Sequence, residues 1–169
     1  MKHLFIISAL AMLAGCASAP HGASTIESGM RASAITRPLS YPVSRESFVW
    51  PVQGQVISQY GSKVDRIINK GIDIKAEEGQ SVRAAKSGRV AYADSHQKGF
   101  GKTVILDHGD RYQTVYSYNS EILVRVGDEV RQGEAIARVG STGRAKTLSL
   151  HFEIRRDGEP QNPVNYLGK

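Results

Sequence analysis

The pattern of apolar and polar positions divides the chain into three parts. A mostly apolar stretch runs from Leu4 to Leu13, and residues 17–48 then show neither a two-residue nor a helical period. From Trp50 onward, short runs rich in β-branched and aromatic residues alternate with glycine-containing turns, which is typical of strands. Eight strands are predicted: Gln55–Ser58, Gly71–Ile74, Ser81–Ala84, Arg89–Ala93, Lys102–Leu106, Gln113–Tyr118, Glu134–Val139 and Leu150–Ile154.

These strands indicate one all-β domain over residues 49–169, because little of this segment has a helical period. A chain of about 120 residues can bury one hydrophobic core, so a single compact domain is expected. Residues 17–48 are rich in Ala, Ser, Thr, Gly and Pro and are interpreted as a flexible tether. Four large aromatic residues are expected in the core: Trp50, Phe100, Phe152 and Tyr166.

Residues 1–16 have the features of a lipoprotein signal peptide. The apolar stretch is too short to cross a bilayer, and Leu13-Ala14-Gly15 leads directly into Cys16. Cleavage before Cys16, the only cysteine of the chain, would leave a thiol for lipidation, and several acyl chains together anchor a protein firmly. An ordinary secretory signal in which Cys16 is incidental is the alternative.

The expected compartment and charge limit the partners. By resemblance to enterobacterial lipoproteins, Ala17 in place of an aspartate indicates a lipid-anchored protein on the outer membrane, facing the periplasm. Export argues against nucleic acid as a partner, and no basic run interleaved with aromatic residues appears. Without residues 1–16 the chain has 21 basic and 16 acidic residues, and this mild positive charge suits an acidic partner or a polyanionic wall.

Two segments with related turn patterns leave a second fold interpretation open. Gly79–Val90 and Gly127–Ile136 each place a glycine turn before a valine and a second glycine before the next strand. Biotinyl and lipoyl carrier domains show the same half-repeat, so a swinging-arm carrier or an adaptor barrel is an alternative. A carrier needs one exposed, modified lysine at a hairpin tip, and neither Lys86 nor Lys146 follows a methionine or an aspartate.

Five segments carry a more specific resemblance. They are Asn69–Ile74, Gly99–Gly101, Tyr116–Tyr118, Gly140–Gly143 and Leu150–Ile154. Their order and spacing resemble those of the LytM or lysostaphin-like zinc endopeptidases, and the likeness extends from Trp50 to Leu167. The resemblance implies a compact antiparallel β-sheet domain with a long groove, related to barrel-sandwich hybrids.

The side chains that zinc chemistry requires in that family are mostly replaced here. A catalytic zinc needs about three protein ligands and an open position for water. By resemblance, Asp73 and His151 stand at two ligand positions, Asn69 stands at the third, and Tyr118 and Ser149 stand where two assisting histidines would be. We therefore expect no catalytic residues and no metal or other cofactor. Asp73 and His151 are vestigial ligand positions, expected to hydrogen-bond each other or nearby loops.

Other polar residues offer no replacement for the missing groups. His96 and His108 are interpreted as solvated loop residues. Ser149 and His151 share one face of a strand, which invites a nucleophile-and-base interpretation. No acidic residue in a motif orients this histidine, however, and no nucleophile elbow surrounds the serine.

Loss of the catalytic residues is typical of LytM-domain factors, family members that activate periplasmic N-acetylmuramoyl-L-alanine amidases. The resemblance implies a non-catalytic regulator of septal or wall remodelling whose groove binds an acidic, amphipathic helix of the amidase. The alternatives are a passive peptidoglycan-binding or structural envelope lipoprotein and a residual zinc endopeptidase. The short tether contains no LysM-type module. The groove residues predicted to bind the partner are Asn69, Lys70, Asp73, Tyr118, Arg144, Ser149, His151 and Arg155.

Overall fold

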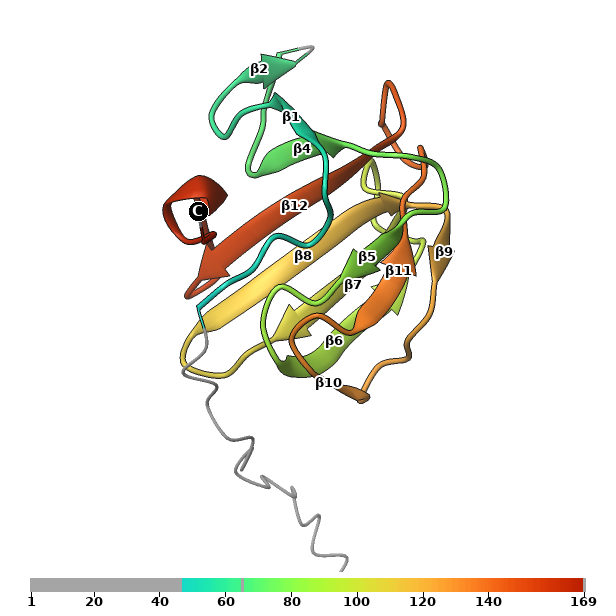
Figure 1. Ribbon diagram of the computed structural model, residues 1–169. Coiled ribbons are helices and arrows are strands. Elements are labelled where there is room, and N and C mark those ends of the chain that lie inside the picture. Colours follow the sequence, from blue (N-terminus) through green and yellow to red (C-terminus); the bar gives the residue numbers. More distant parts are fainter. Residues whose placement is uncertain (1–46, 65, 169) are drawn as a thin grey trace, which may run out of the picture. The chain divides into compact units, whose positions relative to one another are not determined.

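β-Strands form nearly all of the regular structure in residues 47–64 and 66–168, the part of the chain that this computed structural model describes (Figure 1). Within these ranges no helix is long and apolar enough to cross a bilayer. The predicted signal peptide, Cys16 and residues 17–46 of the predicted tether lie outside the described residues.

One antiparallel sheet carries most of the strands. Its order is β1-β4-β12-β8-β7-β6-β10, and β13 pairs with the end of β12. Every neighbouring pair in this sheet is antiparallel, which confirms the predicted fold class. The strand bounds, in sheet order, are Gln55–Ser58, Ile72–Lys75, Ser149–Arg156, Tyr112–Asn119, Lys102–Asp107, Gly88–Asp94 and Glu129–Val130, with β13 at Glu159–Gln161.

Two smaller sheets and one short helix complete the fold. The three-stranded sheet has the order β5-β11-β9, and β2 and β3 form a separate hairpin. All eight predicted strands are present, with ends within two residues of the prediction, whereas β2, β3, β9, β10 and β13 were missed because they are too short to show a period. The bounds are Ser81–Arg83 for β5, Ala135–Arg138 for β11, Glu121–Ile122 for β9, Lys63–Val64 for β2, Ile67–Ile68 for β3 and Pro163–Asn165 for the 3₁₀ helix η1.

The core lies between the large sheet and the sheet β5-β11-β9, which packs against one face of it (Figure 1). Side chains alternate between the two faces of a strand, so every second residue of β12 enters this core. These residues are Leu150, Phe152 and Ile154, and all three are fully buried. The residues between them on β12 face the opposite side of the large sheet.

The four aromatic residues expected in the core divide into three groups. Phe152 is fully buried and packs against Tyr116, as predicted, whereas Phe100 and Tyr166 are only partly buried. Trp50 is 38% exposed, so its predicted core position is wrong. Its indole N–H instead donates to the carbonyl of Gly168 at 2.8 Å, which ties the two ends of the described chain together.

Phe48 begins the packed part of the domain, one residue before the expected start at residue 49. Its ring is buried and meets His108, Tyr112 and Tyr166 edge to face at 5.6 to 6.1 Å between centroids. Such edge-to-face pairs add to the stabilisation from buried area. The backbone of Phe48 also bridges to Leu167, so the last residue of the predicted tether belongs to the core.

His108 is not the solvated loop residue that the sequence suggested. It is fully buried, its Nδ1 lies 2.9 Å from the carbonyl oxygen of Ser87, and its Nε2 lies 2.7 Å from Thr114 Oγ1. Burial lowers the pKa of His108 to about 4, because desolvation disfavours the charged imidazolium. His96 is highly exposed beside Asp94, which agrees with the prediction for that residue.

Lys86, one of the two lysines weighed for a carrier domain, is also inside the molecule. Only 5% of its surface is exposed, and its ammonium lies 5.3 Å from the centre of the Phe48 ring. A cation over an aromatic face is a stabilising contact in a desolvated position. This environment does not suit a modified lysine that must swing through solvent.

Candidate functional site

The candidate site lies where β4 and β12 pair, on the face of the large sheet away from the core. The antiparallel register places Asp73 of β4 directly opposite His151 of β12. Because residues two apart share a face, Ser149, Glu153 and Arg155 lie on the same side of β12 as His151. Strand register thus brings together polar residues that are far apart in the sequence.

His151 sits between two carboxylates. Its Nδ1–H donates to Asp73 Oδ1 at 2.7 Å, and its Nε2–H donates to Glu153 Oε1 at 3.0 Å. Both partners are acceptors, and an imidazole that donates from both nitrogens is the charged form. The predicted hydrogen bond between Asp73 and His151 is confirmed. The expectation that no acidic residue orients His151 is wrong, because Glu153 is fully buried against it.

Glu153 continues the chain of charges to Arg155. The carboxylate oxygen Oε2 accepts from Arg155 Nε at 2.7 Å and lies 2.6 Å from the terminal nitrogen of the same guanidinium. Burial raises the pKa of Glu153, but hydrogen bonds and charges from His151 and Arg155 outweigh burial, so that this pKa lies below its ordinary value. For His151, burial lowers the pKa, and bonds to Asp73 and Glu153 reverse this, so the net pKa is raised.

Two aromatic rings cover His151. The centroid of Phe100 lies 5.5 Å and that of Tyr118 lies 5.3 Å from the imidazole centroid, and the Arg144 guanidinium lies 5.0 Å from the Phe100 centroid. Tyr118 has a φ of 72°, which is uncommon for a residue with a side chain. This backbone interrupts the alternation along β8, so Tyr118 meets His151 whereas Tyr116 faces the core.

Asn69 forms hydrogen bonds that a metal ligand would not form. Its side-chain N–H groups donate to Ser58 Oγ at 2.8 Å and to Asp73 Oδ2 at 3.4 Å. Its side-chain oxygen accepts from the Gly71 backbone N–H at 3.0 Å. The amide is buried, and its hydrogen-bonding groups are satisfied by the protein.

The donors at this site do not fit a catalytic zinc. Both ring nitrogens of His151 are engaged by carboxylates, and Asn69 directs its amide hydrogens, not a lone pair, toward Asp73. Within residues 47–64 and 66–168, no three His, Cys, Asp or Glu side chains are arranged to hold a metal ion. Ser149 Oγ donates to the carbonyl of Thr147 at 3.0 Å, which leaves the serine without the geometry of a nucleophile paired with His151.

A pocket of about 260 Å³ opens above this chain of charges. Six of the eight predicted groove residues line it, and they are Asn69, Asp73, Tyr118, Arg144, Ser149 and His151. Lys70 is exposed outside the pocket, and Arg155 is bound to Glu153 beneath it, so neither forms the lining. The remaining lining residues are Ile57, Ser58, Ile67, Ala145, Lys146 and Thr147.

Sequence reasoning missed the apolar wall of the pocket and the buried carboxylate under it. Ile57 on β1 and Ile67 on β3 are each nearly half exposed, although both are large apolar residues. Ile67 was missed because β3 has only two residues and shows no period, whereas β1 was predicted but its pattern does not show that Ile57 lines a pocket. Glu153 could have been found from its spacing, since it lies two residues beyond His151 on the same strand face.

Several proteins of known name have similar sequences. The lipoprotein NlpD/LppB homolog of Pseudomonas aeruginosa is 44% identical over 120 residues, which are 71% of this chain and 39% of that protein. The murein hydrolase activator NlpD of Escherichia coli (strain K12) is 43% identical over 128 residues, 76% of this chain and 32% of that protein. The murein hydrolase activator EnvC of the same organism is 44% identical over 121 residues, 71% and 29% of the two chains. This chain spans about a third of the length of these relatives.

Solved structures show the same fold. A zinc-containing peptidase from Vibrio cholerae has a TM-score of 0.64 and 28% identity, covering 69% of this chain and 39% of that one. A chain from the SpoIIQ-SpoIIIAH pore-forming complex has a TM-score of 0.66 and 28% identity, covering 75% and 94%. The model of peptidase family M23 matches residues 67–163, more than half of the sequence. The chain therefore belongs to peptidase family M23.

Proposed function

We propose that this protein is a non-catalytic activator of a periplasmic peptidoglycan amidase in septal or wall remodelling. The observation that carries the proposal is a pocket whose floor is a chain of ion pairs, with no donor set for a metal ion among the described residues. The names of the relatives support it, since two of them are murein hydrolase activators. We further propose that the protein is a lipoprotein of the outer membrane, facing the periplasm.

The two walls of the pocket suit an amphipathic segment of the partner. Ile57 and Ile67 form an apolar side, and Arg144 provides a cation on the loop opposite. A helix with an apolar face and acidic residues beside it would match both walls. If the segment blocks the active site of the free amidase, binding in this pocket shifts the amidase population toward the open form.

The proposal is tested by mixing the purified protein with candidate periplasmic amidases and measuring dye release from labelled sacculi. Release should rise with one amidase and stay at background with the protein alone. Binding to sacculi without any effect on an amidase would instead favour a passive wall-binding or structural lipoprotein.

The lack of a zinc-binding donor set leads to a prediction about metal and cleavage. The purified protein, exposed to zinc and then dialysed, is expected to retain well under one zinc per chain and to release no muropeptides from sacculi, because one ligand position holds an asparagine. Elemental analysis and chromatography of digests are the measurements. One tightly bound zinc together with muropeptide products would establish the residual endopeptidase instead.

The proposed lipid anchor depends on one residue outside the described part of the chain. Replacing Cys16 with alanine should abolish palmitate labelling and leave the protein unprocessed or released from the membrane, since Cys16 is the only thiol. Labelling of the wild type and the variant in the same cells, followed by separation of the two membranes, checks both the anchor and the location. Persistent labelling in Cys16→Ala would contradict the lipoprotein assignment.

A further inference from the structure

The β2–β3 hairpin forms part of the apolar wall, yet little of its own structure can hold it. Each strand has two residues, and the pair stands apart from the other sheets. Ile67 and Ile68 are 46% and 55% exposed, so the two side chains of β3 bury little apolar surface. An isolated two-stranded hairpin is marginally stable in water, so its position must come from other contacts.

Asn69 supplies contacts of that kind at the base of the hairpin. Its backbone N–H donates to the carbonyl of Ser62, and its own carbonyl accepts from the N–H of Gly61, both at 2.8 Å. Its side chain donates to Ser58 Oγ on β1, which lies 3.0 Å from Ser62 Oγ. The same side chain accepts from the N–H of Gly71, just before β4. One buried residue thus joins the hairpin to β1 and to the segment that leads into β4.

An asparagine is suited to this task in a way that a histidine is not. Its side-chain amide offers two N–H donors on one atom and an acceptor oxygen, whereas a neutral imidazole offers one donor and one acceptor. Asn69 uses both capacities, toward Ser58 and Asp73 as donor and toward Gly71 as acceptor. The residue at the would-be ligand position therefore has a structural use of its own.

We propose that Asn69 is the positioning residue that holds the β2–β3 hairpin against β1, so that Ile67 and Ile57 form a continuous apolar wall for the partner segment. The inference rests on the proposed function, because it takes the apolar wall to be the surface that binds the amidase. Loss of the Asn69 side chain frees the hairpin from β1 while the core between the two larger sheets stays packed.

Hydrogen exchange of the purified protein tests the positioning role without any partner. In Asn69→Ala, amide hydrogen exchange at Gly61 and residue 69 should become about tenfold faster, because one or two net hydrogen bonds are lost. The amides of β8 and β12 should exchange at the wild-type rate. Ser58→Ala, which removes one hydroxyl and leaves residue 69 intact, should show a smaller change at the same amides. Asn165→Ala, an exposed asparagine on η1, is the matched control and should change neither.

Dose-response curves for amidase activation test whether the apolar wall binds the partner segment. For Asn69→Ala the concentration of half-maximal activation should rise about tenfold with the maximum retained, because a loosened wall weakens binding. Unchanged hairpin exchange in Asn69→Ala overturns the positioning role. If exchange becomes faster but the half-maximal concentration is unchanged, the apolar wall does not contribute to binding the amidase. Absence of activation by the wild type would refute the proposed function, and the exchange result would still decide whether Asn69 holds the hairpin.

Discussion

Replacing Glu153 with alanine is expected to lower the free energy of unfolding by about 3–5 kcal/mol, because it breaks a buried network of charges. Glu153 is fully buried and accepts hydrogen bonds from both His151 and Arg155. Without this carboxylate, the imidazolium keeps only Asp73, and the Arg155 guanidinium loses the partner that neutralises it beneath the pocket. Urea unfolding followed by circular dichroism measures the change.

Two further variants show whether the charge or the packing of Glu153 matters. Glu153→Gln keeps the shape and one acceptor oxygen but removes the charge, so its stability should fall between those of wild type and Glu153→Ala. Glu159→Ala removes an exposed glutamate from the neighbouring strand β13 and should change stability by less than about 0.5 kcal/mol. Wild-type stability for Glu153→Ala would mean that the network contributes nothing to folding.

Reversing the charge of Arg144 is expected to reduce amidase activation more than tenfold, on the order of the loss expected when like charges meet across an interface. Arg144 is exposed on the loop that lines the pocket, and in Arg144→Glu a carboxylate would meet the acidic side of the partner helix. The melting temperature should change little, because the side chain is at the surface. Dye release from labelled sacculi, measured over a range of protein concentrations, gives the effect.

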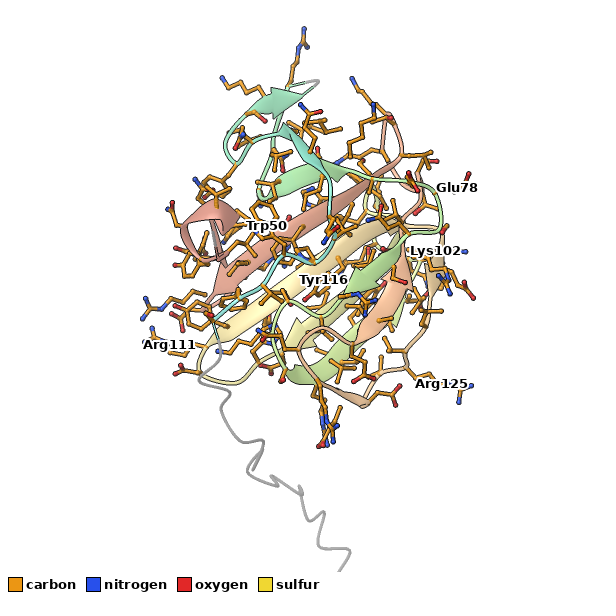
Figure 2. All side chains as sticks on the ribbon, in the orientation of Figure 1. Trp50, Glu78, Lys102, Arg111, Tyr116 and Arg125 are labelled. Carbon is orange, nitrogen blue, oxygen red and sulfur yellow. The ribbon has the colours of Figure 1, made fainter. Side chains whose placement is uncertain are left out.

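Arg125 provides a charge-matched control for this experiment. It is exposed on the loop after β9, at the end of the molecule opposite the β2–β3 hairpin (Figure 2). Arg125→Glu makes the same change of net charge and should activate the amidase like the wild type. Equal activation by Arg144→Glu and Arg125→Glu, with both variants folded, would place the partner surface elsewhere on the protein.

The structure also shows why two other predicted groove residues are poor probes of binding. Arg155→Glu would set a second carboxylate beside the buried Glu153, and the repulsion would destabilise the floor of the pocket. Tyr118 is 5% exposed, lies on His151 and has a left-handed backbone, so its removal alters packing as well as the surface. Loss of activation in either variant would not separate recognition from folding.

The carboxylates at the site are compensated by cations of the protein itself. Asp73 and Glu153 are carboxylates in a poorly hydrated site, and buried anions require a compensating cation. Here the cations are the His151 imidazolium and the Arg155 guanidinium, both held by direct hydrogen bonds. The pocket can therefore keep its shape through protein groups alone.

The sequence by itself determined the six longest strands of the large sheet and two strands of the smaller one, whereas β10 and β13 of the large sheet were missed. Alternation along a strand is a local property, so every strand of four or more residues was predicted. Of the shorter strands only β5 was predicted, and the missed strands have two or three residues. The resemblance to zinc endopeptidases, carried by short sequence segments, likewise implied that Asn69, Tyr118 and Ser149 stand where histidines would be.

The contact between Asp73 and His151 was expected from the family resemblance, whereas only the tertiary structure showed that Glu153 joins His151 to Arg155. The register of β4 and β12 pairs Asp73 with a histidine far along the chain, and local sequence does not encode that register. The left-handed backbone of Tyr118 turns its ring from the core side of β8 to the pocket, against the alternation that the sequence shows.

Burial depends on packing between distant segments and was the least predictable property. His108 occupies a turn in the sequence, but Phe48 from the N-terminal end of the domain covers it and excludes water. Trp50 lies only two residues from Phe48 and remains partly exposed, because its indole N–H needs the Gly168 carbonyl near the surface. Residue type sets the free-energy cost of removing a side chain from water. The fold decides which segment packs against that side chain, and therefore whether new contacts and hydrogen bonds offset this cost.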